Sequence, residues 1–144
     1  MRPLDAFRGI ITGEVEPPPV AGLIGMRMTE IEPGRAVFEL EAGPQHASPL
    51  GTVHGGILCD LADAALGCAL AAQLDEGETF TTLELKMNFL KPVWQGLLRA
   101  EANVIRSGRT IGLVDCRVTD AGGSLVAFAT ATQMTLRGEQ AAGR

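Results

Sequence analysis

The chain has 144 residues and a formal net charge of −5, and 46% of its residues are hydrophobic while 20% are charged. This composition excludes a disordered chain, and the acidic balance argues against a nucleic-acid partner, which favours basic surfaces. The length predicts a single domain over residues 1–144 that needs no disulfide or metal to fold, with a core over about 20–136, a short helix and connector over 1–19, and a frayed tail over 138–144.

The first third of the chain predicts a helix, a connector and two strands. Residues 4–12 have the apolar spacing of a short amphipathic helix, and Pro17-Pro18-Pro19 forces an extended connector. From Leu23 the pattern favours a strand, which ends at the turn signal Pro33-Gly34. Residues 35–42 then alternate in polarity, which predicts a second strand with one buried face.

One long helix follows a loop in the middle of the chain. Residues 43–53 indicate the loop, and Gly55-Gly56 opens a helix over about 55–73. Apolar side chains cover most directions around this helix, so it must be buried on most of its surface. They are Ile57, Leu58, Leu61, Ala62, Ala65, Leu66, Ala69 and Leu70.

The remainder of the chain predicts four strands separated by turn signals, over about 81–90, 97–106, 109–119 and 124–136. In the first of these strands, strict alternation places one set of side chains on each face. One face has Thr81, Leu83, Leu85, Met87 and Phe89, and the other has Thr82, Glu84, Lys86 and Asn88.

A buried helix and a series of strands predict an α+β fold. A curved antiparallel β-sheet of five or six strands wrapped around one long central helix is the economical way to bury that helix. Such a sheet leaves edge strands to protect, and pairing with a second subunit is a common solution. We therefore expect a homodimer, or a homotetramer built as a dimer of dimers.

The cysteines and histidines predict no disulfide and no metal site. Cys59, Cys68 and Cys116 form no C-x-x-C pair, and they have no ligand spacing with His46, a predicted surface loop residue, or His54. The N-terminus lacks the pattern of a secretory signal, and the longest apolar stretch is shorter than the roughly 20 residues of a membrane span. We expect a cytoplasmic protein with reduced thiols that are small core residues.

The segment from Ser48 to Asp63 has the residues best suited to chemistry. Two glycines at a helix start let a ligand approach the backbone, and the free N–H groups there favour an anion or a developing oxyanion. Two turns along the same helix, the carboxylate of Asp63 lies in an apolar run, where an ionised group is costly and often functional. Asp60, Asp63, Ala64, Gly67 and Ala71 share one helix face, which predicts a slot for a partner backbone or a slim acyl chain.

This segment resembles a known family. His54-Gly55-Gly56 followed by Leu61-Ala62-Asp63, with Asp63 nine residues after His54, is similar to hotdog-fold acyl-CoA thioesterases of the phenylacetate-pathway and hydroxybenzoyl-CoA types. Residues 82–92 also resemble the strand that follows the helix in that family, and the resemblance extends over about 20–136. It implies a hotdog fold, hydrolysis of a coenzyme A thioester, and no cofactor.

The resemblance also implies roles for individual residues. Asp63 matches the carboxylate that activates water or attacks the thioester, and Gly55 matches the glycine whose N–H stabilises the oxyanion. Thr82 matches a residue that orients the water, while Ser48 stands where the family usually has Asn or Gln and reaches less far. In that family the site lies between subunits, so Asp63 and Gly55 of one site would come from different chains.

Several residues have a second interpretation. Asp63 could be a structural carboxylate held by backbone N–H groups, and Asp60 could simply complement the helix dipole. We expect Asp60, His54, Gly56 and Gly67 to border the substrate, with His54 holding the loop through hydrogen bonds to the backbone. Arg106 and Arg109 are candidates for the coenzyme A phosphates, although solvated turn charges are the alternative. Thr82 could be an ordinary exposed threonine.

Two other functions are open. One is a non-catalytic acyl-CoA-binding module, against which the presence of Asp63 counts. The other is a hotdog hydratase or dehydratase, which needs a catalytic histidine that His54-Gly55-Gly56 does not resemble. The sequence leaves the acyl group open between aryl and alkyl.

Overall fold

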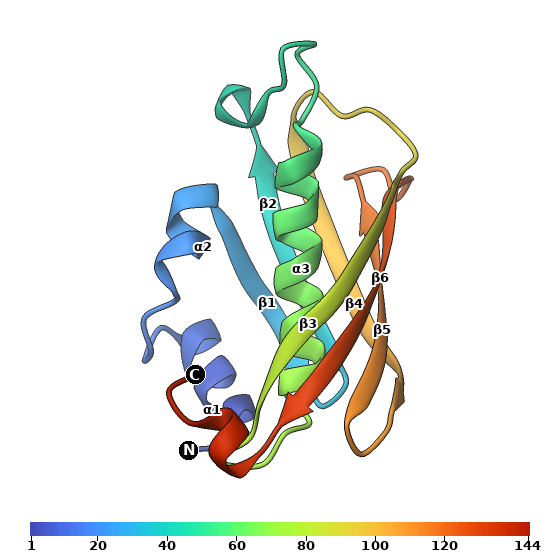
Figure 1. Ribbon diagram of the computed structural model, residues 1–144. Coiled ribbons are helices and arrows are strands. Elements are labelled where there is room, and N and C mark those ends of the chain that lie inside the picture. Colours follow the sequence, from blue (N-terminus) through green and yellow to red (C-terminus); the bar gives the residue numbers. More distant parts are fainter.

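The computed structural model describes all residues, 1–144. Six strands form one sheet in the order β1-β2-β4-β5-β6-β3, and every neighbouring pair is antiparallel. Figure 1 shows the sheet curving around helix α3, as the predicted α+β hotdog fold requires. The elements are α1 (Pro3–Thr12), α2 (Pro19–Ile24), β1 (Met26–Glu32), β2 (Arg35–Ala42), η1 (Pro44–His46), α3 (Gly55–Ala71), β3 (Thr79–Phe89), β4 (Gly96–Ser107), β5 (Ile111–Thr119), β6 (Leu125–Leu136) and η2 (Gly138–Ala141).

Helix α3 packs on the concave face of the sheet because the strands present small side chains there. Leu61, Leu66 and Leu70 of α3 are at most 1% exposed. Many of the sheet residues in the same buried cluster are small, which lets the helix axis approach the strands closely. They include Ala100 and Ala102 on β4, Cys116 on β5, and Ala127, Ala129 and Ala131 on β6.

A β-bulge corrects the predicted faces of β3. Thr82 pairs with Gln133 and Glu84 pairs with Thr132, so Leu83 is the extra residue. Because directly opposed residues point to the same face, Thr82 shares the inner face with Leu85 and not the outer face with Glu84. Strict alternation was therefore the wrong model for this strand.

The segment before β1 also differs from the prediction. Residues Pro19–Ile24 form helix α2, and β1 starts only at Met26, not at Leu23. Pro19 occupies the first turn of α2, where a proline needs no backbone N–H, and Gly25 ends the helix in the left-handed conformation with φ 88°. The proline run therefore starts a helix as well as extending the chain.

His46 is buried, at 4% exposed, and the expectation of a surface loop residue is wrong. Its Nε2 lies 2.7 Å from the carbonyl of Ile24, and its Nδ1 accepts the N–H of Gly43 at 3.1 Å. The ring thus joins η1 to the end of α2. The interior position is favourable for the imidazole because both of its ring nitrogens have backbone partners there.

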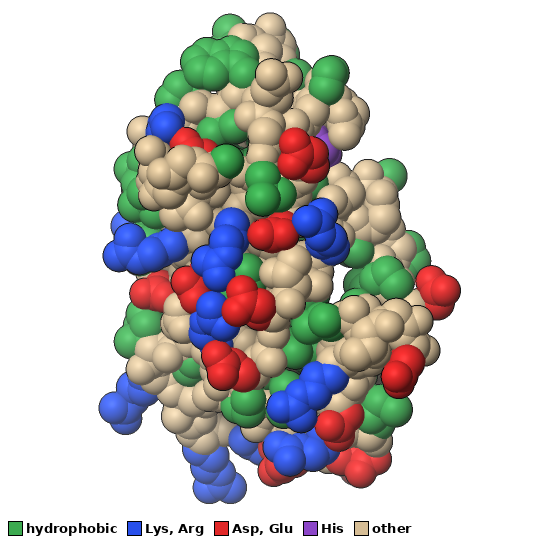
Figure 2. All heavy atoms as spheres, turned by 180° about the vertical axis from the view of Figure 1, so that it is seen from behind, with side chains coloured by type: hydrophobic (Ala, Val, Ile, Leu, Met, Phe, Trp, Pro, Cys, Tyr) green, Lys and Arg blue, Asp and Glu red, His purple; other side chains and the backbone are tan.

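The outer face of β1, β2 and β4 is covered by ion pairs. Arg35 contacts Glu30 at 3.2 Å and Glu101 at 2.6 Å, and Arg99 contacts Glu30 at 3.1 Å. Figure 2 shows basic and acidic side chains interspersed on this side of the molecule.

None of the helices is both long and apolar enough to cross a membrane. The chain end after β6, where a frayed tail was expected, contains the exposed turn η2.

Candidate active site

The N-terminus of α3 has one backbone donor without an acceptor. The His54 carbonyl accepts the N–H groups of Ile57 and Leu58, and its Nδ1 accepts the N–H of Gly56 at 2.9 Å. The N–H of Gly55 has no acceptor within the chain. His54 therefore caps the helix through its side chain, as expected, and leaves the Gly55 N–H at the positive end of the helix dipole.

Both glycines of this turn are in close contact with rings. A Cβ placed on Gly55 would lie 3.1 Å from Cζ of Phe89, and one on Gly56 would lie 3.0 Å from Nδ1 of His54. Larger residues would therefore displace either the Phe89 ring or the cap. The close approach that the sequence predicted at these glycines is present, and the groups that approach are the protein's own side chains.

Ser48 lies in the turn that precedes this helix. Its hydroxyl accepts the N–H of Leu50 at 3.2 Å and lies 3.3 Å from Oγ1 of Thr52, while its own N–H donates to the Thr52 carbonyl at 2.6 Å. The hydroxyl thus has partners inside its own turn. Its role in holding water stays a prediction.

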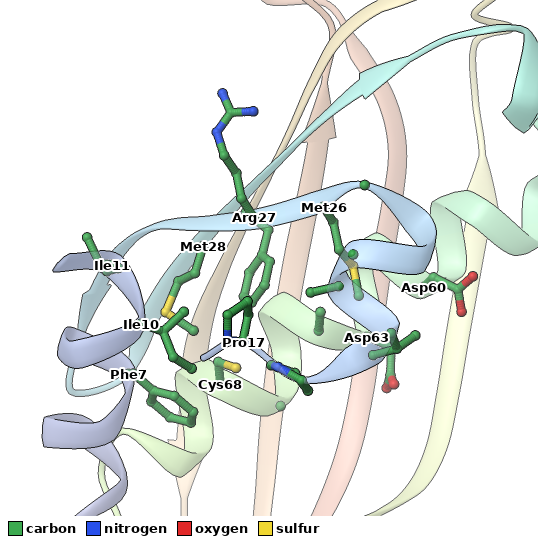
Figure 3. Close-up of a pocket in the computed structure, with 18 of the residues that line it drawn as sticks. Phe7, Ile10, Ile11, Pro17, Met26, Arg27, Met28, Asp60, Asp63 and Cys68 are labelled. Carbon is green, nitrogen blue, oxygen red and sulfur yellow. The ribbon is translucent and has the colours of Figure 1, made fainter. Parts of the chain in front are cut away.

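Asp63 lies at the mouth of a cavity of about 760 Å³, on the face of α3 that carries the small residues. Figure 3 shows Asp60 and Asp63 at one end and Phe7 and Ile10 of α1 at the other. The surrounding protein raises the pKa of Asp63 by desolvation, and the neighbouring charge of Asp60 raises the pKa further. No hydrogen bond within the chain stabilises either carboxylate, so the alternative of a carboxylate capped by backbone N–H groups is wrong for Asp63.

The predicted slot along α3 exists, and part of it is filled. Ala64, Gly67 and Cys68 line the cavity beside the two acids. The Phe80 ring of β3 covers Gly67, where a Cβ would lie 2.8 Å from its Cζ. The cavity therefore has a wall of small residues from α3, closed on one side by an aromatic ring.

The N-terminal residues that line this cavity were not predicted as part of the site. Phe7, Ile10 and Ile11 of α1 and Val20 and Ala21 of α2 all border it. The sequence contained their signal, because 4–12 has an amphipathic pattern, but nothing along the chain indicates which surface its apolar face contacts. The structure brings α1 against β1 and α3, and α2 against β1, as Figure 1 shows.

Thr82 is half-buried on the inner face, and a side chain that the sequence did not single out contacts it. Gln133 is fully buried, its Nε2 donates to Oγ1 of Thr82 at 3.5 Å, and its Oε1 has no partner. The alternative of an ordinary exposed threonine is therefore wrong for Thr82.

Arg106 and Arg109 are exposed at the hairpin between β4 and β5, and neither lines the cavity. Arg109 offers its carbonyl to Nη1 of Arg137 at 2.6 Å. Their contact with coenzyme A phosphates stays a prediction.

The three thiols are poorly suited to nucleophilic chemistry. Burial raises the pKa of Cys68 and of Cys116 to about 12, and burial together with the nearby acids raises that of Cys59. No group of three histidine, cysteine or acidic side chains is arranged to hold a metal ion. The carboxylates of α3 and the free N–H of Gly55 are therefore the groups best suited to take part in a reaction.

Comparisons with known proteins agree with this geometry. A model of the thioesterase superfamily matches residues 50–127. A Saccharolobus solfataricus protein provisionally named an esterase is 33% identical over 79% of this chain and 81% of its own length. The 1,4-dihydroxy-2-naphthoyl-CoA hydrolase of Listeria monocytogenes is 29% identical over 76% of this chain and 89% of its own. The crystal structure of a phenylacetic acid degradation-related protein of Ralstonia eutropha has a TM-score of 0.82 at 34% identity and covers 90% of this chain and 98% of that one.

The chain belongs to the thioesterase superfamily and has its hotdog fold. It is a hydrolase of the class that acts on thioesters. The family resemblance drawn from His54-Gly55-Gly56 and Asp63 is confirmed.

Proposed function

We propose that the protein hydrolyses an acyl-coenzyme A thioester to a free acid and coenzyme A, with Asp63 as the catalytic carboxylate. The observation that carries this proposal is the environment of Asp63. Its carboxylate lies at the mouth of an apolar cavity, has no hydrogen-bond donor within the chain, and has a raised pKa. A carboxylate left without partners is available to water or to a substrate carbonyl.

The reaction needs a stabilised oxyanion as well as a base or nucleophile. The free N–H of Gly55, at the positive end of α3, is suited to the developing negative charge on the thioester oxygen. Asp63 either takes a proton from the attacking water or attacks the carbonyl carbon itself. In the first route the water oxygen bonds to the carbonyl carbon, the C–S bond breaks, and the sulfur leaves as a thiol with the proton that Asp63 took. In the second route the C–S bond breaks as a mixed anhydride forms on Asp63, and the leaving thiolate takes a proton from water. A further water molecule then hydrolyses the anhydride to the free acid and regenerates Asp63. The proposed reaction needs no cofactor.

We propose that each site is shared between two subunits. Gly55 and Asp63 are eight residues apart on one helix, which at about 1.5 Å per residue separates them by roughly 12 Å. One thioester group cannot contact both, because hydrogen-bond reach is about 3 Å. Gly55 of one chain and Asp63 of another can meet if two chains associate, so a homodimer, or a dimer of dimers, is part of this proposal.

The edge strand β3 supports such an association. It spans 11 residues and pairs on one side only, with β6. Leu83 and Phe89 on this strand are each 56% exposed, and Phe89 contacts Gly55. An edge with exposed apolar side chains is suited to pairing with a second chain. In the assembled site, Thr82 and Ser48 are candidates for holding the water, and Arg106 and Arg109 for the phosphates.

The two alternative functions have less support. A hydratase would need a catalytic histidine, and Nδ1 of His54 is occupied by the Gly56 N–H. A non-catalytic module would not require a carboxylate kept without partners beside the cavity.

Release of free thiol from a panel of aryl- and alkyl-coenzyme A thioesters tests the proposal. We expect turnover well above spontaneous hydrolysis with at least one thioester. We expect none with the matching thioethers, which lack the carbonyl oxygen. Binding of the thioesters without any thiol release would favour the non-catalytic module instead.

A further inference from the structure

The cavity beside Asp63 is long and has two different ends. It follows α3 from Asp60 to Cys68, and eight residues of helix correspond to about 12 Å. The carboxylates lie at one end, and Phe7 and Ile10 of α1 lie at the other (Figure 3). A group that enters past Asp63 therefore ends against the first helix of the chain.

The cavity interior offers no partner to a charged acyl group. Arg27 is the one basic residue along its wall, and its side chain extends away from the cavity (Figure 3) to pair with Glu39 at 3.0 Å. The mouth has two acidic groups, Asp60 and Asp63, which repel a second carboxylate on the substrate. The acyl group that fits is therefore uncharged along its length.

The shape of the cavity favours an extended acyl group. Its volume of about 760 Å³ is that of a pocket for a drug-sized ligand, and the cavity follows the helix. The thioester carbonyl must lie beside Asp63, and the five residues of helix from Asp63 to Cys68 correspond to about 7.5 Å. An extended alkyl chain, whose bonds of about 1.5 Å advance roughly 1.25 Å each, covers that length with about six carbons. Met26 and Met28, which line the wall, are flexible side chains that adapt to such a chain.

We propose that α1 and α2 close an acyl channel that takes a linear, uncharged acyl group of about six to eight carbons, with α1 as the end wall that limits chain length. This inference rests on the proposed thioesterase function and names its substrate class. It assigns a specificity role to the N-terminal residues Phe7 and Ile10 and to Cys68.

Chain length is the first variable to test. With saturated acyl-CoA substrates from four to fourteen carbons, kcat/KM should rise about fourfold per added methylene, the change that burial of one CH₂ predicts. The increase should appear mainly in KM and end near eight carbons, and kcat/KM of the best linear substrate should exceed that of benzoyl- and phenylacetyl-CoA. A flat profile, or an aryl thioester as the best substrate, would overturn the inference and leave the proposed function standing.

Two variants at the far end should move the limit in opposite directions. Cys68→Leu fills the end of the channel, so octanoyl-CoA should lose more than tenfold in kcat/KM while butyryl-CoA stays within about twofold. Ile10→Ala extends the channel, so the optimum should move to longer chains. Leu23→Phe is the matched control, because Leu23 lies on α2 but is 83% exposed and outside the channel. Unchanged profiles in both channel variants would contradict the role of α1.

A binding measurement separates the two proposals. Calorimetric titration with S-alkyl-coenzyme A thioethers, which cannot be hydrolysed, should show affinity rising to about eight carbons. The same dependence of affinity on chain length, without hydrolysis of any thioester, would contradict the proposed function and still support the channel. Hydrolysis with equal affinity for butyl and octyl thioethers would contradict the channel alone.

Discussion

The ring of Phe80 lies against the bare backbone of Gly67, so close that a Cβ on Gly67 would be 2.8 Å from Cζ of Phe80. This contact joins the edge strand β3 to α3 one turn after Asp63. It also sets the width of the cavity, which both residues line. The glycine is needed for the ring and not for a special backbone conformation, because it lies inside a regular helix.

We therefore expect Gly67→Ala to narrow the cavity and to destabilise the protein slightly. Overpacking costs about 1–3 kcal/mol, and the gain in helix propensity of about 1 kcal/mol offsets part of it, which leaves a net loss near 1 kcal/mol. Urea denaturation measures the change. Gly22→Ala in α2 is the matched control, because nothing lies within 4 Å of its added Cβ. An equal change in the free energy of unfolding in the two variants would mean that the Phe80 ring shifts without cost to admit the added Cβ.

The raised pKa of Asp63 predicts the acid limb of the pH profile. Because partial desolvation and the charge of Asp60 favour the protonated form, the pKa of Asp63 lies above the ordinary aspartate value of 3.8. The midpoint of the acid limb of kcat/KM should lie above pH 3.8. It should move to lower pH in Asp60→Asn, because that variant removes one of the two causes of the raised pKa. A limb at or below the ordinary value, measured with a substrate that does not titrate there, would contradict the assignment.

Mixed dimers test whether the site is shared. Asp63→Asn lacks the carboxylate, and Gly55→Pro lacks the N–H. Proline suits the first helical position, although the Phe89 ring must shift to make room for its side chain. A dimer of one chain of each kind keeps one intact site if Gly55 and Asp63 act from different subunits. Coexpression in equal amounts should restore about a quarter of wild-type activity, since half the dimers are mixed and each has one of two sites. No recovery from mixtures that sedimentation shows to be dimeric would place both groups in one chain.

Gln133 predicts a change in stability. Its buried Oε1 has no partner, and its only hydrogen bond, to Thr82, is long at 3.5 Å. Gln133→Met keeps the shape and removes the unsatisfied carbonyl, so the free energy of unfolding should rise by about 1 kcal/mol. Gln133→Glu, of equal size, should lower it because a charge replaces the amide. A loss of stability in Gln133→Met would indicate that Oε1 has a partner such as a buried water.

The local pattern of the chain predicted the parts of the fold that depend on it. The apolar surface of α3 predicted a buried helix over about 55–73, and the structure has it over Gly55–Ala71. The alternation in 35–42 predicted β2 with its inner face correctly. His54 was expected to hold its loop through the backbone, and it caps α3.

The features that the sequence could not predict depend on contacts between distant segments. A bulge at Leu83 depends on the register of β3 against β6, and it moved Thr82 to the inner face. Burial of His46 depends on the carbonyl of Ile24, 22 residues earlier in the chain. The role of Phe7 and Ile10 as the end of a cavity depends on where α1 packs, and an amphipathic pattern identifies the face of a helix but not its partner.

The most direct test of the catalytic assignment compares Asp63→Asn with Asp60→Asn in steady-state thioester hydrolysis. Loss of the catalytic carboxylate should raise the barrier by about 4 kcal/mol and slow turnover roughly a thousandfold, while Asp60→Asn should stay within about tenfold. The folded state holds the pKa of Asp63 above its unfolded value, so its stabilising contribution is present only at low pH and is lost as the pH rises through the raised pKa. At neutral pH, Asp63→Asn should therefore be at least as stable as the wild type in urea denaturation. A nearly normal Asp63→Asn enzyme beside an inactive Asp60→Asn would contradict the account.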